Sequence, residues 1–443
     1  MLQAISPVDG RYAGKTKALI PYFSEFALIR ARVRIEIEYL IALADLNLDQ
    51  LAPFDQATKA RLLAIHRDFS EADARVVKDI EATTNHDVKA VEYFLKDRME
   101  AIGLGAQKEW VHFALTSQDV NNTATPLLLQ DAMQSVILPA AIRVNAMLME
   151  LARSWHGVPM LAHTHGQPAS PTTVGKELRV FIERIDAQLS TLGSQSYYGK
   201  FGGATGNFNA HKVAYPQIDW RAFGDRLMNA LRLERIQTTT QIDHYDHLAE
   251  VMHAMIRLST ILVDLCRDIW SYISMDYFRQ NIVAGEVGSS TMPHKVNPID
   301  FENAEGNLGV AIALFNHLAI KLPVSRLQRD LTDSTVLRNL GVPFAHFLIA
   351  AGSIDKGLRK LELNRARLDA DLERNWIVTA EAIQTILRRE GVPQPYELLK
   401  QLTRGKGNVD QKAMFAFIEG LDISEDVKRE LKEITPFNYV GYA

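Results

Sequence analysis

The sequence contains a single cysteine, Cys266, among its 443 residues. An intrachain disulfide is therefore impossible, which fits a protein of a reducing compartment. Cys266 follows the apolar stretch from Ile261 to Leu265, in a segment of helical character. A free thiol in such surroundings packs like a small apolar side chain. We therefore expect Cys266 to be an inert core residue.

Glycine and proline are also scarce, with 25 and 16 residues, and the sequence shows no sustained alternation of apolar and polar residues. A half-buried β-sheet requires that alternation. We therefore expect an all-α fold. Hydrophobic residues make up 47% of the chain and charged residues 23%, which are ordinary globular values and exclude wholesale disorder.

The chain lacks an excess of positive charge. It has 49 Lys and Arg and 53 Asp and Glu, which gives a net charge of -4. This balance argues against nucleic acid and anionic membranes as partners. The N-terminus has no basic region followed by an apolar one, and no segment reaches about 18 uninterrupted apolar residues. We expect a cytoplasmic protein.

The stretch from Asp246 to Tyr277 contains neither glycine nor proline and predicts a helix about 45 Å long. Its apolar residues, among them Val251, Leu258 and Leu265, cover too much of the circumference for a helix with one exposed face. Such a helix needs neighbours, and these can come from other subunits.

Further helices are expected along most of the chain. Breaker-rich segments separate them, and we place domain boundaries near residues 107 and 358. This gives an N-terminal helical domain (1–106), a central long-helix bundle (107–358) and a small C-terminal helical domain (359–443). Three longer helices are expected from Ser24 to about Asp45, from Thr125 to Trp155 with a kink at Pro139, and from Ser170 to about Leu192. Two short helices are expected over 395–402 and 410–420. Asp55 and Asp87 are expected to cap two more helices.

The loop from Gly288 to Pro298 is rich in hydrogen-bond donors and in residues that forbid regular structure. A serine such as Ser289, beside a cation and backbone amides, can hold a stabilised alkoxide. Lys295 could neutralise negative charge that develops on a substrate carboxylate. This combination suits proton abstraction next to a carboxylate, although a polar surface loop has a similar composition.

Two histidines, His163 and His165, alternate shortly before the expected helix at Ser170. His-x-His can bind a metal when it follows a strand, but no strand is expected here and no matching ligand set follows. We favour general acid or base catalysis by one histidine. The alternative is that both are bystanders.

Two further segments contain candidate functional residues, but their sequence patterns are less specific. Asn85-His86-Asp87 is expected to form a turn and a helix start, and Asn85 or Asp87 could simply cap that helix. Arg329, Ser334 and Arg338 could bind phosphate, or could be exposed helix charges. Near the N-terminus, residues 10–16 are one residue short of P-loop spacing and follow no expected strand, which argues against nucleotide triphosphate binding there.

Residues 288–298 match throughout the signature Gly-Ser-Ser-x-Met-Pro-x-Lys-x-Asn-Pro of the fumarase/aspartase superfamily. Within it, the sequence resembles the bacterial-type adenylosuccinate lyases over essentially the whole chain, through residues 6–12, 84–87, 116–119, 164–168 and 328–331. The resemblance implies a three-domain all-α fold with a central long-helix bundle. It also implies a homotetramer whose sites are shared between subunits, and no metal or organic cofactor.

The resemblance implies β-elimination of fumarate from adenylosuccinate, which gives AMP, and from SAICAR, which gives AICAR. By motif matching, Ser289 is the expected base and His165 the expected acid. Lys295 would stabilise the carbanion intermediate, Glu302 would orient or charge-pair the acid, and His86 would contact substrate with an open share in proton transfer.

Further substrate contacts follow from the same resemblance. The substrate carries close to four negative charges, which explains several arginines near one site in an acidic protein. The matching substrate-binding positions are Arg11, Tyr12, Asn85, His86, Asp87, Thr116, Ser117, Gln241, Lys295, Asn297, Asn303, Arg329, Ser334 and Arg338.

Two other functions remain open on the sequence. One is another lyase of the superfamily, acting on argininosuccinate, on fumarate or malate, or on aspartate. His294 and the arginine segment favour a phosphorylated nucleotide instead. The other is a structural protein, as in the eye lens protein that resembles argininosuccinate lyase. Intact Ser289, His165 and Lys295 argue against a purely structural role.

Overall fold

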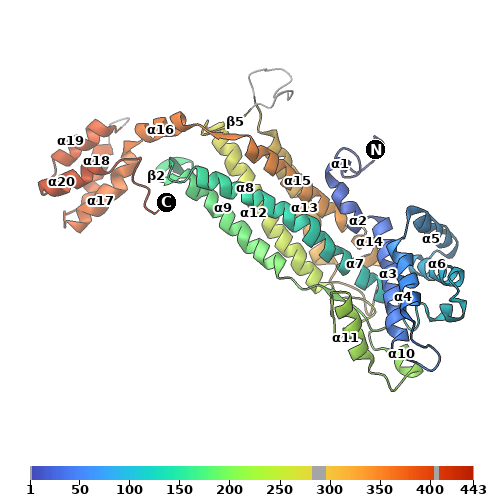
Figure 1. Ribbon diagram of the computed structural model, residues 1–443. Helices are drawn as coiled ribbons and strands as arrows, with labels where there is room; N and C mark the ends of the chain where they lie inside the picture. The colour runs from blue at the N-terminus through green and yellow to red at the C-terminus, as the bar shows by residue number, and fades with distance from the viewer. Residues whose placement is uncertain (1, 282–295, 404–408, 443) are drawn as a thin grey trace. The chain divides into compact units, whose positions relative to one another are not determined.

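The computed structural model describes residues 2–281, 296–403 and 409–442 and confirms the predicted all-α class. Its contacts divide the chain into two compact units, each built from separated segments (Figure 1). The division into three domains stays a prediction. Unit 1 comprises Met1–Ala141, Gln188–Thr260 and Gly306–Gly352, and unit 2 comprises Ile142–Ala187, Ile261–Glu305 and Ser353–Ala443.

Unit 1 is centred on α3 (Glu25–Ala44), which begins where the Ser24 side chain accepts a hydrogen bond from the backbone N–H of Ala27. Helix α3 packs on α4 to α7, and a core that includes Val33, Leu62 and Phe94 joins α3 to α4, α5 and α6. The other elements of unit 1 are α1 (Ala13–Thr16), η1 (Lys17–Leu19), α2 (Ile20–Phe23), α4 (Gln56–Arg67), α5 (Glu71–Thr84), α6 (Asp87–Ala101), η2 (Gly105–Trp110), α7 (Ser117–Ala132), η3 (Met133–Ile137), β3 (Tyr198–Gly199), α10 (Asn209–Ala214), α11 (Trp220–Ala230), β4 (Glu234–Arg235) and α14 (Thr332–Leu337).

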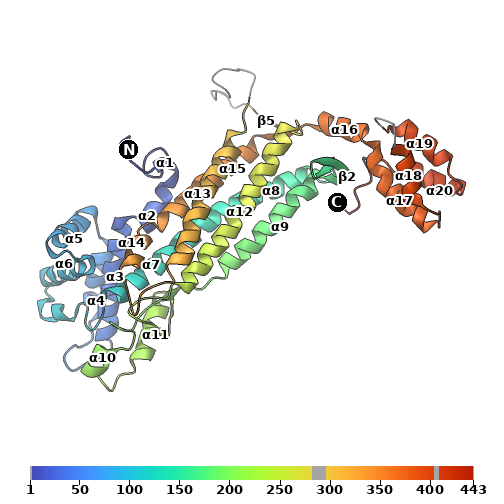
Figure 2. The same ribbon diagram turned by 180° about the vertical axis from the view of Figure 1, so that it is seen from behind.

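Five long helices contribute residues to both units, and their unit 2 parts run side by side (Figures 1 and 2). They are α8 (Leu138–Ser154), α9 (Val174–Gly193), α12 (Asp246–Ser274), α13 (Ile299–Lys321) and α15 (Gly341–Arg359). The 29 residues of α12 confirm the predicted long helix. On it, Cys266 is only 1% exposed, and burial raises the pKa of its thiol to about 12, as expected of an inert core residue.

The predicted helix from Thr125 to Trp155 is longer at its start than expected. It begins at Ser117, because Thr116 and Asp119 form a capping box, so Pro126 lies inside the helix. A π-helical turn, Met133–Ile137, comes just before Pro139, whose ring cannot accommodate a regular preceding turn. By length and composition, Ser117–Ser154 is the one helix among the described residues that could cross a membrane, a test that soluble core helices also pass.

Unit 2 contains a β-hairpin that the sequence analysis did not expect. Strands β1 (Pro159–Thr164) and β2 (Gln167–Thr173) pair antiparallel, and α9 therefore begins at Val174 rather than at Ser170. Proline is tolerated in edge strands and at bulges, and both strands of an isolated hairpin are edges. The pair Ser170-Pro171, which suggested a helix cap, thus belongs to a strand.

The C-terminal part of unit 2 confirms the two predicted short helices, α18 and α19. Asp410 caps α19 by accepting a hydrogen bond from the N–H of Ala413, and a core that includes Leu387 and Ile418 holds this helical cluster together. The remaining elements of unit 2 are β5 (Phe278–Gln280), β6 (Leu361–Leu363), α16 (Arg365–Arg374), η4 (Trp376–Thr379), α17 (Ala380–Arg389), α18 (Pro395–Thr403), α19 (Gln411–Glu419) and α20 (Glu425–Glu433).

Candidate active site

The predicted site residues divide between the two units. Ser289 and Lys295 lie outside the described residues. Unit 2 carries His165, Asn297, Glu302 and Asn303. Unit 1 carries Arg11, Tyr12, Asn85, His86, Asp87, Thr116, Ser117, Gln241, Arg329, Ser334 and Arg338.

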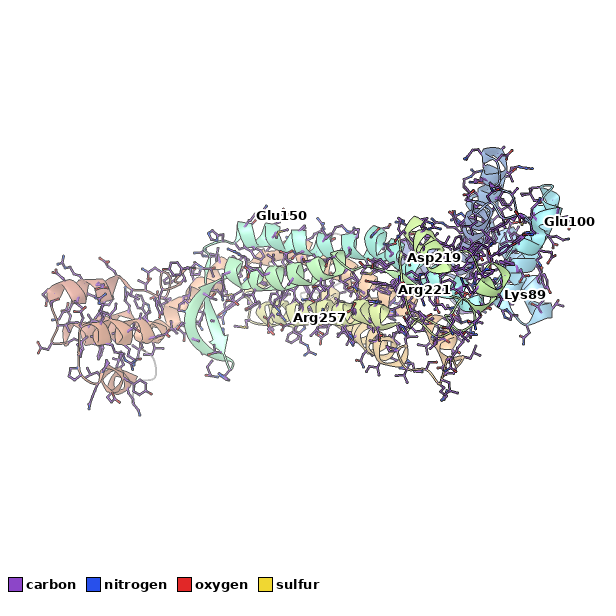
Figure 3. All side chains as sticks on the ribbon, turned by 90° about the horizontal axis from the view of Figure 1, so that it is seen from below. Lys89, Glu100, Glu150, Asp219, Arg221 and Arg257 are labelled. Atoms are coloured by element: carbon purple, nitrogen blue, oxygen red, sulfur yellow. The ribbon has the colours of Figure 1, made fainter. Side chains whose placement is uncertain are left out.

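His86 lies between two helices of unit 1 and caps the second one. Asn85 adopts a left-handed conformation that ends α5, and the ring Nδ1 of His86 accepts the N–H of Lys89 at 3.1 Å. His86 is therefore the cap of α6, and the expectation that Asp87 caps it was wrong. Lys89 and Glu100, labelled in Figure 3, lie near the two ends of this helix.

The cap determines how His86 can act. Because Nδ1 accepts a hydrogen bond, the proton of the neutral ring resides on Nε2. Nε2 lies 3.5 Å from the hydroxyl of Ser117, a second predicted substrate-binding residue, and the ring is exposed. His86 can thus donate a hydrogen bond to a ligand beside Ser117.

Asp87 is held by a buried arginine. The guanidinium of Arg32 lies 2.7 Å from the Asp87 carboxylate and also donates to Asn121 at 2.8 Å. Burial by itself raises the pKa of Asp87, but Arg32 outweighs it, so the pKa lies below the ordinary value. A cavity of about 320 Å³ brings Asp87 together with Ser334 and Arg338.

Arg329 lies in unit 1 beside Gln241 and Ser334, and we call these three residues the Arg329 group. Their role in substrate binding stays a prediction. Arg329 donates to the Gln241 amide oxygen at 3.2 Å and to the Ser334 hydroxyl at 3.4 Å. Its Nε is buried and has no hydrogen-bond partner among the described residues. A buried cationic donor without a partner is costly, so this group is suited to an anionic ligand.

The sequence analysis missed the buried ion pair of Asp119 and Lys200. The two charged groups lie 2.7 Å apart, and each residue is at most 1% exposed. The Asp119 carboxylate also accepts the N–H groups of Thr116 at 2.8 Å and Gly202 at 2.9 Å. It therefore fixes the turn that presents Thr116 and Ser117. The T-x-x-D capping pattern signals the turn, whereas nothing near Lys200 signals the pairing.

In unit 2, His165 lies at the tip of the β1–β2 hairpin, which we call the histidine hairpin. Thr164 pairs with Gln167, so His165 and Gly166 form a two-residue turn, and both have positive φ, 55° and 74°. Such turns match the twist of a hairpin and tolerate a non-glycine residue at some cost. His165 is exposed and makes no hydrogen bond to the described residues.

Glu302 and Asn303 lie near the start of α13, in the part of that helix that belongs to unit 2. The indole N–H of Trp270 donates to Glu302 at 3.1 Å, and the Ser353 hydroxyl donates to Asn303 at 2.9 Å. No hydrogen bond joins Glu302 to His165 within the described part of one chain. The predicted pairing of these two residues stays a prediction.

Strand β1 contains His163 and leads into His165, so the expectation that no strand precedes these histidines was wrong. The His163 ring packs against Tyr277, with centroids 6.1 Å apart. The part of the chain that the structure describes contains no group of three or more His, Cys, Asp or Glu side chains placed to hold a metal ion. The predicted lack of a metal stays a prediction.

Comparisons with known proteins match lyase families along almost the whole chain. Residues 10–312 match the model of a lyase family, and residues 325–440 match the adenylosuccinate lyase C-terminal family. The adenylosuccinate lyase of Dictyostelium discoideum is 56% identical, with 99% of this chain and 97% of that protein covered. That of Escherichia coli strain K12 is 50% identical, with 100% and 97% covered.

Solved structures show the same fold at lower identity. A fumarate lyase from Mesorhizobium sp. BNC1 has a TM-score of 0.76 at 19% identity, with 96% of this chain and 95% of that chain covered. A 3-carboxy-cis,cis-muconate lactonizing enzyme from Pseudomonas putida has a TM-score of 0.74 at 21% identity, with 96% and 94% covered.

Proposed function

Because the chain belongs to the adenylosuccinate lyase family, we propose that it releases fumarate from adenylosuccinate, which gives AMP, and from SAICAR, which gives AICAR. The full-length identity to proteins of that name carries this proposal. The Arg329 group supports it, because a buried donor that no described residue pairs suits an anionic ligand.

The reaction requires one base and one acid. Ser289 removes the proton from the carbon beside a substrate carboxylate, and Lys295 stabilises the added negative charge. The electron pair then forms the double bond of fumarate while the carbon–nitrogen bond breaks. His165 protonates the departing nitrogen, so the protons balance and no oxidant or cofactor is needed.

The residues of unit 1 bind rather than react. Arg11, Arg329 and Arg338 would hold the phosphate and carboxylates through charge-assisted hydrogen bonds. His86 would donate from Nε2, consistent with its acceptor role at Nδ1. The further contacts proposed for unit 1 are Tyr12, Asn85, Thr116, Ser117 and Gln241, and Asp87 acts through Arg32. In unit 2, Asn297 and Asn303 would also contact substrate, and Glu302 would orient the acid.

The active unit would be a homotetramer whose sites draw residues from several chains. One face of α13 supports this, because Gly306 and Gly309 leave open space and Val310 and Ile320 are 44% and 62% exposed. Small and apolar residues on an exposed face permit close approach of another helix. The missing hydrogen bond between Glu302 and His165 is consistent with a partner subunit that supplies one of them.

We propose a cytoplasmic location, because a chain with a single cysteine forms no intrachain disulfide and fits a reducing compartment.

The test is direct. The protein is incubated separately with adenylosuccinate, argininosuccinate, malate and aspartate, and the ultraviolet spectrum or amine release is followed. Turnover of adenylosuccinate alone supports the proposal. Turnover of another substrate assigns a different lyase activity, and no turnover of any of the four substrates by folded protein favours a structural role.

A further inference from the structure

The position of His165 depends on the hairpin that carries it. A two-residue turn has little freedom of its own, so the direction of its tip follows from the two strands. In β1, Leu161 pairs with Pro171 and Ala162 pairs with Ala169, so Ser170 is an extra residue that pairs with neither. Such a bulge bends the strand and re-aims the residues beyond it.

The bulge is anchored from outside the hairpin. The Ser170 hydroxyl donates a hydrogen bond to the Oε2 atom of Glu381, in the first turn of α17. The phenol of Tyr439, in the segment that follows α20, donates to the same oxygen at 3.0 Å. One carboxylate oxygen thus joins the hairpin, α17 and the C-terminal segment, all within unit 2.

Apolar packing also joins the hairpin to α16, to η4 just before α17, and to the C-terminal segment. Leu161, which is 1% exposed, forms a buried cluster with Leu372 and Val378, and Phe437 of the C-terminal segment packs against it. Both ribbon views place the C-terminus beside β2 (Figures 1 and 2). Val440 and Tyr442 also line a cavity of about 750 Å³ together with Thr164, the residue before His165.

We propose that Glu381, with Ser170 and Tyr439, is a positioning residue that fixes the bulge and thereby the direction of His165. This role rests on the proposed function, in which His165 is the acid. Glu381 touches no reacting atom, so its loss should misplace the acid rather than remove it. The turnover number should fall while substrate binding, which depends on other residues, stays nearly unchanged.

The first experiment is Glu381→Ala, which removes the oxygen that accepts both hydrogen bonds. We expect kcat with adenylosuccinate to fall on the order of 10- to 100-fold with KM changed less than about two-fold, the cost of misplacing a catalytic group slightly. Glu397→Ala is the matched control, because Glu397 is exposed in the first turn of α18. Wild-type kcat in Glu381→Ala would overturn the proposal.

Combination variants separate positioning from general damage. Tyr439→Phe should lower kcat, whereas Tyr396→Phe, at an exposed tyrosine of unit 2, should not. Adding Tyr439→Phe to Glu381→Ala should cost little more, since both changes break the same interaction. If the double variant instead lowers kcat by the product of the two single effects, Glu381 and Tyr439 do not act through one shared anchor.

The last variant distinguishes this proposal from the proposed function. In a His165→Gln background, Glu381→Ala should not lower the residual rate further, because the group that Glu381 positions is gone. An equal further loss there would show a structural role and overturn the positioning. If His165→Gln alone keeps wild-type kcat, the acid assignment itself fails. If His165→Gln is inactive and Glu381→Ala is normal, only the positioning proposal fails.

Discussion

The Arg329 group of unit 1 and the histidine hairpin of unit 2 hold their functional side chains in different ways. Arg329 is fixed by two hydrogen bonds and keeps one buried donor that no described residue pairs. His165 is exposed at the tip of a turn, and only the backbone and the anchor of the bulge decide where it points. The comparison suggests that binding residues are fixed by side-chain contacts before substrate arrives, whereas the proposed acid is placed through its hairpin.

The largest expected effect concerns the reacting groups. His165→Ala and Ser289→Ala should each lower kcat by a factor on the order of 10² to 10⁴, with binding largely kept, because a general acid or base contributes about that much. Steady-state kinetics and calorimetry check the two parts. A variant that keeps more than about a tenth of wild-type kcat would assign the role to another group.

The same two variants test whether a site is shared between subunits. Co-expressed with different affinity tags, they should regain roughly a quarter of wild-type activity in mixed tetramers, since about one site in four then receives both intact residues. Mixed tetramers as inactive as either parent would place His165 and Ser289 of each site on one chain.

A large effect on stability is expected at the pair that supports the turn before Ser117. Lys200→Met should lower the free energy of unfolding by about 3–5 kcal/mol, because it leaves the buried Asp119 charge uncompensated. Urea unfolding measures it. The control is Lys108→Met, at an exposed pair with Glu100, where the loss should be much smaller because solvent screens the pair. Equal losses would show that burial of the pair is unimportant.

A smaller effect is expected from Arg329→Ala, which sharpens the contrast between binding and reaction. KM should rise on the order of 10-fold and more than kcat falls, because a guanidinium that holds an anion acts in ground and transition states alike. Arg326→Ala is the control, since the Arg326 side chain is 79% exposed and pairs with Asp330. An unchanged KM with a collapsed kcat would remove Arg329 from the binding residues.

The pair of His112 and Glu36, in the same unit as the Arg329 group, predicts a pH dependence of stability. Burial lowers the pKa of His112, but Glu36 at 2.5 Å outweighs it, so the pKa lies above 6.5. This raised pKa gives a stabilisation that is complete below the unfolded-state value and lost as pH rises through the folded-state value. His112→Asn should therefore cost more stability at pH 5.5 than at pH 8.5.

Thermal and urea unfolding at the two pH values measure this difference. His253→Asn, at an exposed position of α12, serves as the control variant. A cost for His112→Asn that grows as pH rises would reverse the sign and contradict the ion pair.

The smallest effect is expected at Cys266. Burial raises the pKa of its thiol to about 12, so it should react with a thiol reagent only after unfolding. Cys266→Ala should leave kcat and KM within about two-fold of wild type, since no predicted contact of either unit includes it. Rapid modification of the folded protein with loss of activity would give Cys266 a functional role.

The sequence by itself determined the all-α class, the long helix α12, the inert Cys266 and the family, because helical periodicity and contiguous motifs are local properties of the chain. Two predictions from local propensity were wrong. Ser170-Pro171 suggested a helix cap but lies in strand β2, which pairs with β1, and Asp87 suggested the cap of α6, which is His86 instead.

Only the tertiary structure decided which distant residues meet. Asp119 and Lys200 lie 81 positions apart, and Ser170 and Glu381 lie 211 positions apart, so no spacing in the sequence could pair them. The same holds for Arg329 and Gln241, which the family resemblance assigned to one site but whose hydrogen bond is a fact of the fold. Long-range contacts depend on how helices and strands pack, and packing responds to the shapes of all neighbours at once.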